Sequence, residues 1–503
     1  MKEQCQSECL NEMYTRLNTK QKVAADTIME YVRTGCIGGE SIDFLVLQGY
    51  AGTGKTTTLS TALELIDEPF AMTAPTHKAV KVIKSMCEDK SDCIYGTIHA
   101  LLGLTQKIDN KGKVSYIRQS KYKDKLASVS VLIIDEASML DPELFKLIME
   151  YKQTKPSFPL IFVGDKAQIP PVGHDESYVF DDAKLLGKYK VHTMVLDVPM
   201  RQCHESGILR LATAIREDQT TDVCIDEYIN ALDVVKCSTE YFTSEILPIY
   251  KDSYEINPDK FKVLAWTNAQ VDLMNRLIRE YRFNSKVLPK VIVGDLLIAG
   301  DHIIDHTDFI PKVIAVTSDE LEVLEVTEVT KNLPYTLFHS KTKLFQLAKD
   351  NLQTPGEYIR STNWKESEKL HLEVKCYMCK VLINQDEIAT IYVLHELSED
   401  DFKRTAYLLE TTAKEFTSYS GRILPSAAWR AFYAFKESVA NVQYNYALTV
   451  HKSQGSTFES VLVIMQDIDK NKTSATYRDT KTLERNRIKY VAVSRAKAKL
   501  YIT

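Results

Sequence analysis

The chain has 503 residues, a length that at about 150 residues per domain predicts about three domains. Hydrophobic residues make up 44% and charged residues 26%, which argues against disorder, collagen or a coiled coil. The net charge of -5 excludes a uniformly basic nucleic-acid coat but allows a local basic groove. The ten cysteines are scattered along the chain, which favours a reducing compartment over a disulfide scaffold. No apolar run is long enough to span a bilayer, and the first residues lack the apolar core of a secretory signal.

Two clusters of short apolar runs alternate with longer helix-like stretches, a pattern typical of buried parallel strands in α/β layers. The first cluster comprises Phe44–Leu47, Val131–Ile134 and Leu160–Val163. The second cluster comprises Val263–Trp266, Ala447–Val450, Val461–Met465 and Tyr490–Val493. The sequence therefore predicts two α/β parts.

Two segments of different character interrupt these parts. The larger contains strand-like stretches at His371–Leu382 and Glu387–Tyr392, and then a helix that begins near Ser426. The aromatic residues of that helix recur at helical spacing, so we expect them to pack in a core. The expected division is 1–97 and 128–199 for the first α/β part, 98–127 for its insertion, 200–300 and 441–503 for the second part, and 301–440 for its insertion.

A phosphate-binding motif, GxxxxGK[ST], follows the first apolar run and precedes a helix-like segment. Glycines let backbone N–H groups turn inward, and the helix N-terminus adds positive potential for phosphate oxygens. Lys55 is expected to reach the outer phosphates of ATP, and Thr56 to bind Mg²⁺. The nucleotide-binding residues predicted here are Gly49, Tyr50, Ala51, Gly52, Thr53, Gly54, Lys55, Thr56 and Thr57.

Two carboxylates, Asp135 and Glu136, directly follow the run Val131–Ile134. This is the place where nucleotide-hydrolysing enzymes carry their magnesium-binding acid. Asp135 is therefore a candidate Mg²⁺ ligand, and Glu136 a candidate general base that activates the attacking water.

Six further segments resemble, in chain order, the motifs of superfamily 1 helicases. They are Asn18–Gln21 (Q motif), Thr73–Lys78 (motif Ia), Thr97–His99 (motif Ib), Val163–Pro171 (motif III), Leu448–Thr457 (motif V) and Tyr490–Ala496 (motif VI). Within that superfamily the chain is most similar to superfamily 1B DNA helicases of the Dda-like and RecD-like type. The phrases APTHKA, TIHALL, IDEASM, TVHKSQG and YVAVSRA carry this resemblance.

The resemblance implies two RecA-like domains, with a small β-hairpin insertion in the first and an SH3-like insertion in the second. It implies an ATP-dependent helicase that moves 5′ to 3′ on single-stranded DNA and unwinds duplex in replication, recombination or repair. Forked duplex DNA, and replication or single-strand-binding proteins, would be its partners. We expect a protein that acts as a monomer, without a membrane partner, in the cytoplasm (the host cytoplasm if the source is viral).

The same resemblance assigns roles to residues outside the phosphate loop. Gln21 would read adenine, Gln168 would take part in catalysis, and Arg201 and Arg495 would touch the γ-phosphate from the second α/β part. The DNA contacts expected by position are Pro75, Thr76, His77, Thr97, His99, Thr449 and His451.

A basic segment, 101–125, contains seven basic and two acidic residues and therefore carries a net charge of +5. Asn110–Gly112 can turn a hairpin, followed by Val114, Tyr116 and Arg118 in alternation. Two interpretations remain open: a solvated basic loop, or a pin that splits the duplex while Tyr116 stacks on the fork base pair and so contacts DNA.

Cys376 and Cys379 form a CxxC motif, but no second pair follows at metal-binding spacing, so a structural role is expected. Two alternative functions also remain open. An RNA-directed or RNA–DNA remodelling ATPase of the same superfamily is the first, because contacts to the 2′-OH cannot be located in the sequence. A P-loop phosphotransferase or nucleotide switch without nucleic acid is the second, and motifs V and VI argue against it.

Overall fold

The computed structural model divides the chain into two compact units. The larger unit contains Met1–Gly103, Ser120–Ser285 and Tyr446–Thr503, and the smaller contains Leu104–Gln119 and Lys286–Asn445. The structure describes residues 13–50, 52–66, 68–74, 80, 84, 93–118, 124–171, 173–174, 176–198, 206–218, 221–230, 232–252, 257, 259–305, 312–339, 341–362, 365, 367–416, 425–470 and 478–503.

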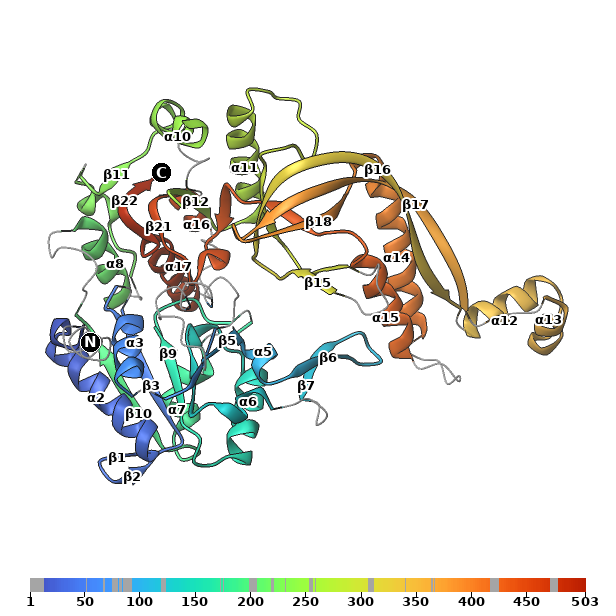
Figure 1. The fold of residues 1–503 in the computed structure, drawn as a ribbon. Coiled ribbons are helices and arrows are strands. Elements are labelled where there is room, and N and C mark those ends of the chain that lie inside the picture. Colours follow the sequence, from blue (N-terminus) through green and yellow to red (C-terminus); the bar gives the residue numbers. More distant parts are fainter. Residues whose placement is uncertain are drawn as a thin grey trace, which may run out of the picture. The chain divides into compact units, whose positions relative to one another are not determined.

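The first lobe of the larger unit, up to residue 198, is built on a six-stranded parallel sheet with buried central strands (Figure 1). In sheet order the strands are β10 (Val191–Leu196), β3 (Phe44–Gly49), β9 (Leu160–Gly164), β8 (Val131–Ile134), β4 (Phe70–Ala74) and β5 (Ile94–Thr97). Its helices include α2 (Thr19–Thr34), α3 (Lys55–Ile66), α5 (Ile98–Leu101), α6 (Pro142–Thr154) and α7 (Asp182–Leu185). The apolar sides of α2 and α3 pack with β3 and β4 into one core.

The second lobe, residues 206–285 and 446–503, contains a five-stranded parallel sheet. In sheet order its strands are β11 (Val234–Lys236), β22 (Ala496–Ile502), β21 (Phe458–Val463), β12 (Phe261–Ala265) and β20 (Ala447–Thr449). Its helices include α8 (Gly207–Glu217), α10 (Leu247–Asp252), α11 (Asn268–Arg282), α16 (Met465–Asp469) and α17 (Arg478–Val493). The prediction of an α/β protein with two parallel sheets is confirmed.

One predicted strand is wrong. Tyr490–Val493 forms the last turn of α17, and the strand β22 begins only at Ala496. All four residues of the run are buried, so the helix is apolar all round at this end. A short buried run cannot be assigned to helix or strand from its hydrophobicity alone.

The smaller unit is built on a five-stranded antiparallel sheet instead. Its strands, in sheet order, are β18 (Glu387–Leu394), β17 (Ser367–Ile383), β16 (Glu320–Phe338), β13 (Leu296–Ala299) and β19 (Val442–Tyr444). Strands β16 and β17 form a long hairpin that carries α12 (Lys341–Asp350) and α13 (Pro355–Thr362) at its end (Figure 1). Helices α14 (Glu399–Phe416) and α15 (Pro425–Lys436) pack against it. The predicted strands and the predicted helix of this segment are confirmed; its SH3-like character stays a prediction.

The basic segment forms the predicted hairpin, with β6 (Leu104–Ile108) and β7 (Val114–Arg118) paired antiparallel. Its turn rests on α15. Gly112 has a φ of +81°, and a Cβ at this position would lie 2.6 Å from the indole of Trp429. The hydroxyl of Tyr433 donates to the carbonyl oxygen of Gly112 at 3.3 Å, and Ile108 packs against Trp429. An isolated two-stranded hairpin is marginally stable, so α15 supplies the support it needs.

We predict that Gly112→Ala will loosen the hairpin. A non-glycine residue in left-handed backbone costs about 1–2 kcal/mol, and the added methyl group would also displace Trp429. Amide hydrogen exchange in residues 104–118 should accelerate. Gly187→Ala is the matched control, because Gly187 has a φ of +75° but a Cβ added there would meet nothing within 4 Å. Equal exchange in the hairpin of both variants would contradict the packing argument.

Candidate functional site

The phosphate loop lies between the buried strand β3 and the N-terminus of α3, as predicted. Its shape requires glycine. Gly52 and Gly54 have φ of +78° and +75°, and a Cβ at Gly49 would lie 2.6 Å from the hydroxyl of Thr53. With these turns the loop can aim its N–H groups at an anion in front of the helix.

Lys55 begins α3, and its ammonium group stays over the loop. Its Nζ donates to the carbonyl oxygens of Gly49 at 2.8 Å and Tyr50 at 3.1 Å. Thr53 donates through its hydroxyl to the same Tyr50 carbonyl at 2.9 Å. Thr56 and Thr57 follow in the first turn, whereas Ala51 lies outside the described residues. The loop and Lys55 thus form a cradle suited to the phosphates of a nucleotide.

Gln21 is almost completely buried and is bound at both ends of its carboxamide. Its Oε1 accepts from the backbone N–H of Asn18, whose side chain caps α2 in return, and its Nε2 donates to the carbonyl oxygen of Thr53 at 3.0 Å. A Cβ at Gly54 would lie 2.6 Å from this Nε2. Gln21 therefore restrains the phosphate loop directly; its reading of adenine stays a prediction.

Asp135 and Glu136 follow β8, one strand removed from β3 in the sheet. Burial and the charge of Glu136 raise the pKa of Asp135, while its backbone hydrogen bond and Lys55 oppose this. Glu136 has a φ of +51°, uncommon for a non-glycine residue, and its Oε2 is buried without a hydrogen-bond partner in the described structure. Such strain and an unpaired carboxylate oxygen are typical of functional sites.

This donor set fits a nucleoside triphosphate with Mg²⁺. The hydroxyl of Thr56 and the carboxylate of Asp135 are oxygen ligands of the kind that Mg²⁺ prefers. A cation would also favour the charged form of Asp135, against the burial that raises its pKa. A side chain at Gly49 or Gly54 would collide with Thr53 or Gln21, respectively.

The segment after β9 joins the first lobe to the second. Gln168 is nearly buried, and its Oε1 has no hydrogen-bond partner among the described residues. The next residue, Ile169, accepts at 3.1 Å from the Nε2 of Gln454 in the second lobe. This region of motif III is therefore in direct contact with motif V.

Arg495 is buried in the second lobe. Its Nε donates to the carbonyl oxygen of Val491, its Nη1 to that of Ser456, and its Nη2 to the hydroxyl of Ser494. The guanidinium thus bridges motifs V and VI. Its contact with the γ-phosphate stays a prediction, and Arg201 lies outside the described residues.

Of the predicted DNA-binding residues, Pro75, Thr76 and His77 lie outside the described residues. Thr97 caps α5, accepting from the N–H of Ala100 at 3.4 Å, and His99 follows in the same turn.

The two candidates in the second lobe are Thr449, the last residue of β20, and His451, two residues later. Thr449 accepts from the N–H of Lys452 at 3.3 Å. Burial lowers the pKa of His451, although Glu484 opposes this. The DNA-binding roles of these residues stay predictions.

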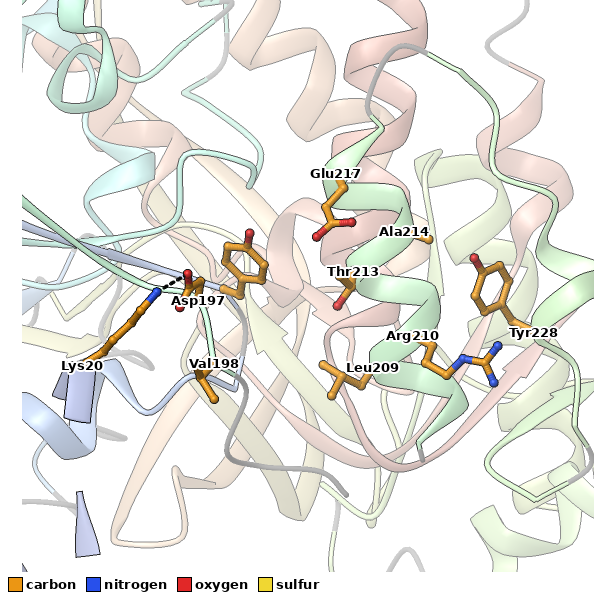
Figure 2. Close-up of a pocket in the computed structure, with 10 residues that line it drawn as sticks. Lys20, Asp197, Val198, Leu209, Arg210, Thr213, Ala214, Glu217 and Tyr228 are labelled. Carbon is orange, nitrogen blue, oxygen red and sulfur yellow. Dashed lines mark hydrogen bonds and ion pairs between the residues drawn. The ribbon is translucent and has the colours of Figure 1, made fainter. Parts of the chain in front are cut away.

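A cavity of about 670 Å³ opens beside the phosphate loop. Figure 2 shows Lys20 and Asp197 of the first lobe, joined by an ion pair, across from Thr213 and Glu217 of α8. Tyr50 also lines it, so the cavity is continuous with the loop. It offers room beside the phosphates for the rest of a nucleotide.

Three residues that the sequence does not single out complete the interface between the lobes: Asp165, Arg216 and Tyr490. Arg216 donates to Asp165 at 3.1 Å, and the hydroxyl of Tyr490 donates to the other carboxylate oxygen at 2.5 Å. Asp165 lies within motif III and Tyr490 within motif VI, but Arg216 lies in no motif, and its partner is far away in sequence.

Cys376 and Cys379 lie on β17, where residues three apart point to opposite faces. They accordingly belong to different hydrophobic cores. Burial raises the pKa of the Cys379 thiol to about 12. This geometry fits the structural role expected for both. No helix within the described ranges combines the length and apolar character that crossing a bilayer needs.

The chain is similar to several known proteins and protein families. An AAA domain family matches residues 40–174, and a UvrD-like helicase C-terminal domain family matches residues 444–503. An uncharacterized protein, R530, of Acanthamoeba polyphaga mimivirus is 28% identical over 90% of this chain and 94% of its own. The ATP-dependent DNA helicase dda of Enterobacteria phage T4 is 23% identical over 89% of this chain and 92% of its own. The crystal structure of Pif1 helicase from Candida albicans aligns with 97% of this chain and 94% of that chain, at 17% identity and a TM-score of 0.45.

We predict that Gln21→Ala will destabilise α2 and the phosphate loop. The change removes the capping contact and leaves the buried carbonyl of Thr53 without its donor, at a cost of about 1–3 kcal/mol. Hydrogen exchange in residues 19–34 and 49–58 reports both effects. Gln21→Glu keeps an acceptor for Asn18 but removes the donor to Thr53, so it should affect the loop more than the helix. Unchanged exchange in the loop of both variants would contradict the restraint.

Proposed function

Because the chain is related to the superfamily 1B helicases, which include Dda, RecD and Pif1, we propose that it is an ATP-dependent DNA helicase. It moves 5′ to 3′ along single-stranded DNA and separates the strands of forked duplex. The observation that carries this proposal is a phosphate loop in one lobe beside a segment that is hydrogen-bonded to the other lobe. Gln454, Arg216 and Tyr490 of the second lobe all bind the segment that follows β9.

Hydrolysis uses residues at the carboxyl ends of neighbouring strands. Lys55 and the N–H groups of the loop bind the outer phosphates, and Thr56 and Asp135 would hold Mg²⁺. Bound there, Mg²⁺ would supply positive charge to offset the charge that develops on the transferred phosphoryl group. Glu136, whose Oε2 is buried without a partner in the described structure, orients the attacking water and accepts its proton. Gln168, which lies next to the lobe interface, responds to whether the phosphates, Mg²⁺ and the attacking water are in place.

Arginines from the second lobe complete the site when the lobes approach. Arg495 and Arg201 stabilise the γ-phosphate, a role that in comparable sites contributes about 10³–10⁵ in rate. These arginines contact the γ-phosphate when ATP is bound and lose that contact when ADP is bound. The bound nucleotide therefore determines which arrangement of the two lobes is favoured. Repeated closing and opening would then grip and release the strand.

Single-stranded DNA lies across both lobes in this proposal. Pro75, Thr76, His77, Thr97 and His99 of the first lobe, and Thr449 and His451 of the second, are its contacts. Hydroxyls, imidazoles and backbone groups position a phosphate chain without reading its sequence, as a motor on arbitrary DNA requires. Action as a monomer, a cytoplasmic location and replication or single-strand-binding protein partners belong to the same proposal.

We predict that the protein unwinds duplex with a 5′ single-stranded tail and leaves duplex with a 3′ tail intact. The measurement is strand separation of fluorescent forks that differ only in the tail, with ATP and Mg²⁺. Lys55→Ala, which removes the ammonium group over the loop, should lower ATP hydrolysis by about 100-fold or more. Preference for the 3′ tail would reject the direction, and hydrolysis stimulated by poly-U but not poly-dT would favour an RNA substrate.

We also predict that Tyr116 acts as a wedge at the fork. The side chain is 43% exposed on a hairpin that α15 supports, and stacking on an aromatic ring contributes about 1–3 kcal/mol per base. Tyr116→Ala should therefore slow unwinding several-fold more than translocation on single strands. Tyr116→Phe should retain unwinding because it keeps the ring. Ile117→Ala removes a comparably exposed apolar side chain (40% exposed) from the other face of β7 and is the matched control. Equal losses of unwinding and translocation in Tyr116→Ala would refute the wedge.

A further inference from the structure

Asp165 is a completely buried carboxylate at the boundary between the lobes. Its first oxygen accepts from the N–H of Ala167 at 3.0 Å and from the Nη2 of Arg216 at 3.1 Å. Its second oxygen accepts from the hydroxyl of Tyr490 at 2.5 Å. Two of these three donors come from the second lobe, so a single first-lobe side chain holds α8 and α17 together.

Arg216 also contacts the phosphate loop. Its guanidinium carbon lies 3.5 Å from the centroid of the Tyr50 ring, close enough for a planar cation to stack on the aromatic face. Its side chain is 10% exposed, and its Nε is buried without a hydrogen-bond partner in the described structure. The guanidinium therefore stacks on the Tyr50 ring with its face and donates a hydrogen bond to Asp165 from its edge.

Tyr50 connects this contact to the residue that binds phosphate. Its carbonyl oxygen accepts from the Nζ of Lys55 at 3.1 Å, within the same loop. A movement of Lys55 toward a phosphate changes that hydrogen bond, and a movement of the Tyr50 ring changes the surface on which Arg216 rests. The loop and the lobe interface are thus in continuous contact.

The charges in this cluster keep it intact. Burial is the largest single influence on the pKa of Arg216 and lowers it, but Asp165, Tyr490 and Tyr50 together outweigh burial and leave the pKa raised. Arg216 therefore stays charged, and Asp165 is paired with it. An ion pair that only joined the two lobes would not require Arg216 to contact Tyr50 of the phosphate loop as well.

We propose that Arg216 is a positioning residue that couples the phosphate loop to the second lobe, stacking on Tyr50 and acting through Asp165 and Tyr490. This inference rests on the proposed function. A nucleotide that rearranges Tyr50 and Lys55 shifts Arg216, and the shift reaches α17 through Asp165 and Tyr490. Motif VI begins in the last turn of α17 and continues to Arg495, so nucleotide state changes the second lobe and its grip on DNA. By thermodynamic linkage, DNA changes nucleotide affinity by the same factor.

The test is the ratio of oligo-dT affinities with and without a non-hydrolysable ATP analogue, measured by fluorescence anisotropy. Allosteric ratios are typically about 5–150-fold, and the unmodified protein is expected in that range. Arg216→Lys keeps a cation for Asp165 but loses the planar stack on Tyr50, so its ratio should fall at least about fivefold toward one. Tyr490→Phe removes only the hydroxyl bound to Asp165 and should lower the ratio as well. Tyr50→Phe keeps the ring and should preserve it.

A matched control separates coupling from stability. Tyr250→Phe removes a buried hydroxyl that donates to the carbonyl oxygen of Tyr446 at 3.2 Å, entirely within the second lobe. Its ratio should equal that of the unmodified protein. Thermal melting and the affinity for a fluorescent ADP are measured on every variant as readouts independent of hydrolysis.

Three outcomes overturn the inference. An unchanged ratio in both Arg216→Lys and Tyr490→Phe removes the coupling role. A fall that Tyr250→Phe shares, in proportion to loss of melting temperature, assigns the effect to stability instead. Absence of DNA binding or of any nucleotide effect in the unmodified protein rejects the proposed function, and this inference with it. A reduced ratio in Arg216→Lys and Tyr490→Phe, with Tyr50→Phe and Tyr250→Phe unaffected, supports the inference.

Discussion

The phosphate loop has to turn successive backbone N–H groups inward, and neighbouring residues hold it in that shape. Left-handed backbone at Gly52 and Gly54 makes the turn, and the absence of a side chain at Gly54 admits Gln21. Gln21 binds the Thr53 carbonyl, while the N–H of Tyr50 donates to the carbonyl oxygen of Leu196 at 3.2 Å. Helix α2 and strand β10 therefore restrain opposite parts of one loop. These contacts restrain the backbone of the loop before any phosphate binds.

The parallel sheet determines where the remaining chemistry lies. Adjacent parallel strands end at the same edge, so the carboxylates that follow β8 and β9 come near the loop after β3. The two have different partners. Asp135 is influenced by Lys55 of the phosphate loop and by Glu136. Asp165 is bound to Arg216 and Tyr490 of the second lobe. In the proposed function, one sheet edge would thus serve hydrolysis and inter-lobe contact through separate carboxylates.

Much of this arrangement can be predicted from the sequence, because local patterns determine it. Val131–Ile134 is recognisable as a buried strand because loop residues bound a short run, and the hairpin turn at Gly112 has its own local signal. The capping box of Asn18 and Gln21 is also a local pattern, although the contact of Gln21 with the loop is not. The strand predicted at Tyr490–Val493 is wrong because a short apolar run suits a buried helix equally well. The pairing of Arg216 with Asp165 has no sequence signal, since it arises only when the two lobes meet.

In the smaller unit, the helix α15 contacts the antiparallel sheet with one part of its length and the β6–β7 hairpin with another. The aromatic residues of α15 are predicted to pack in a core, and Phe435 does so against the long antiparallel sheet. Trp429, nearer the start of the same helix, is 5% exposed and belongs to a second core cluster, which Ile108 of the hairpin joins. A hairpin rich in lysine would otherwise have little apolar surface to bury, and charge repulsion within it would oppose a fixed position. The same helix thus packs against the sheet and supports the turn at Gly112, which joins the hairpin to the core of the smaller unit.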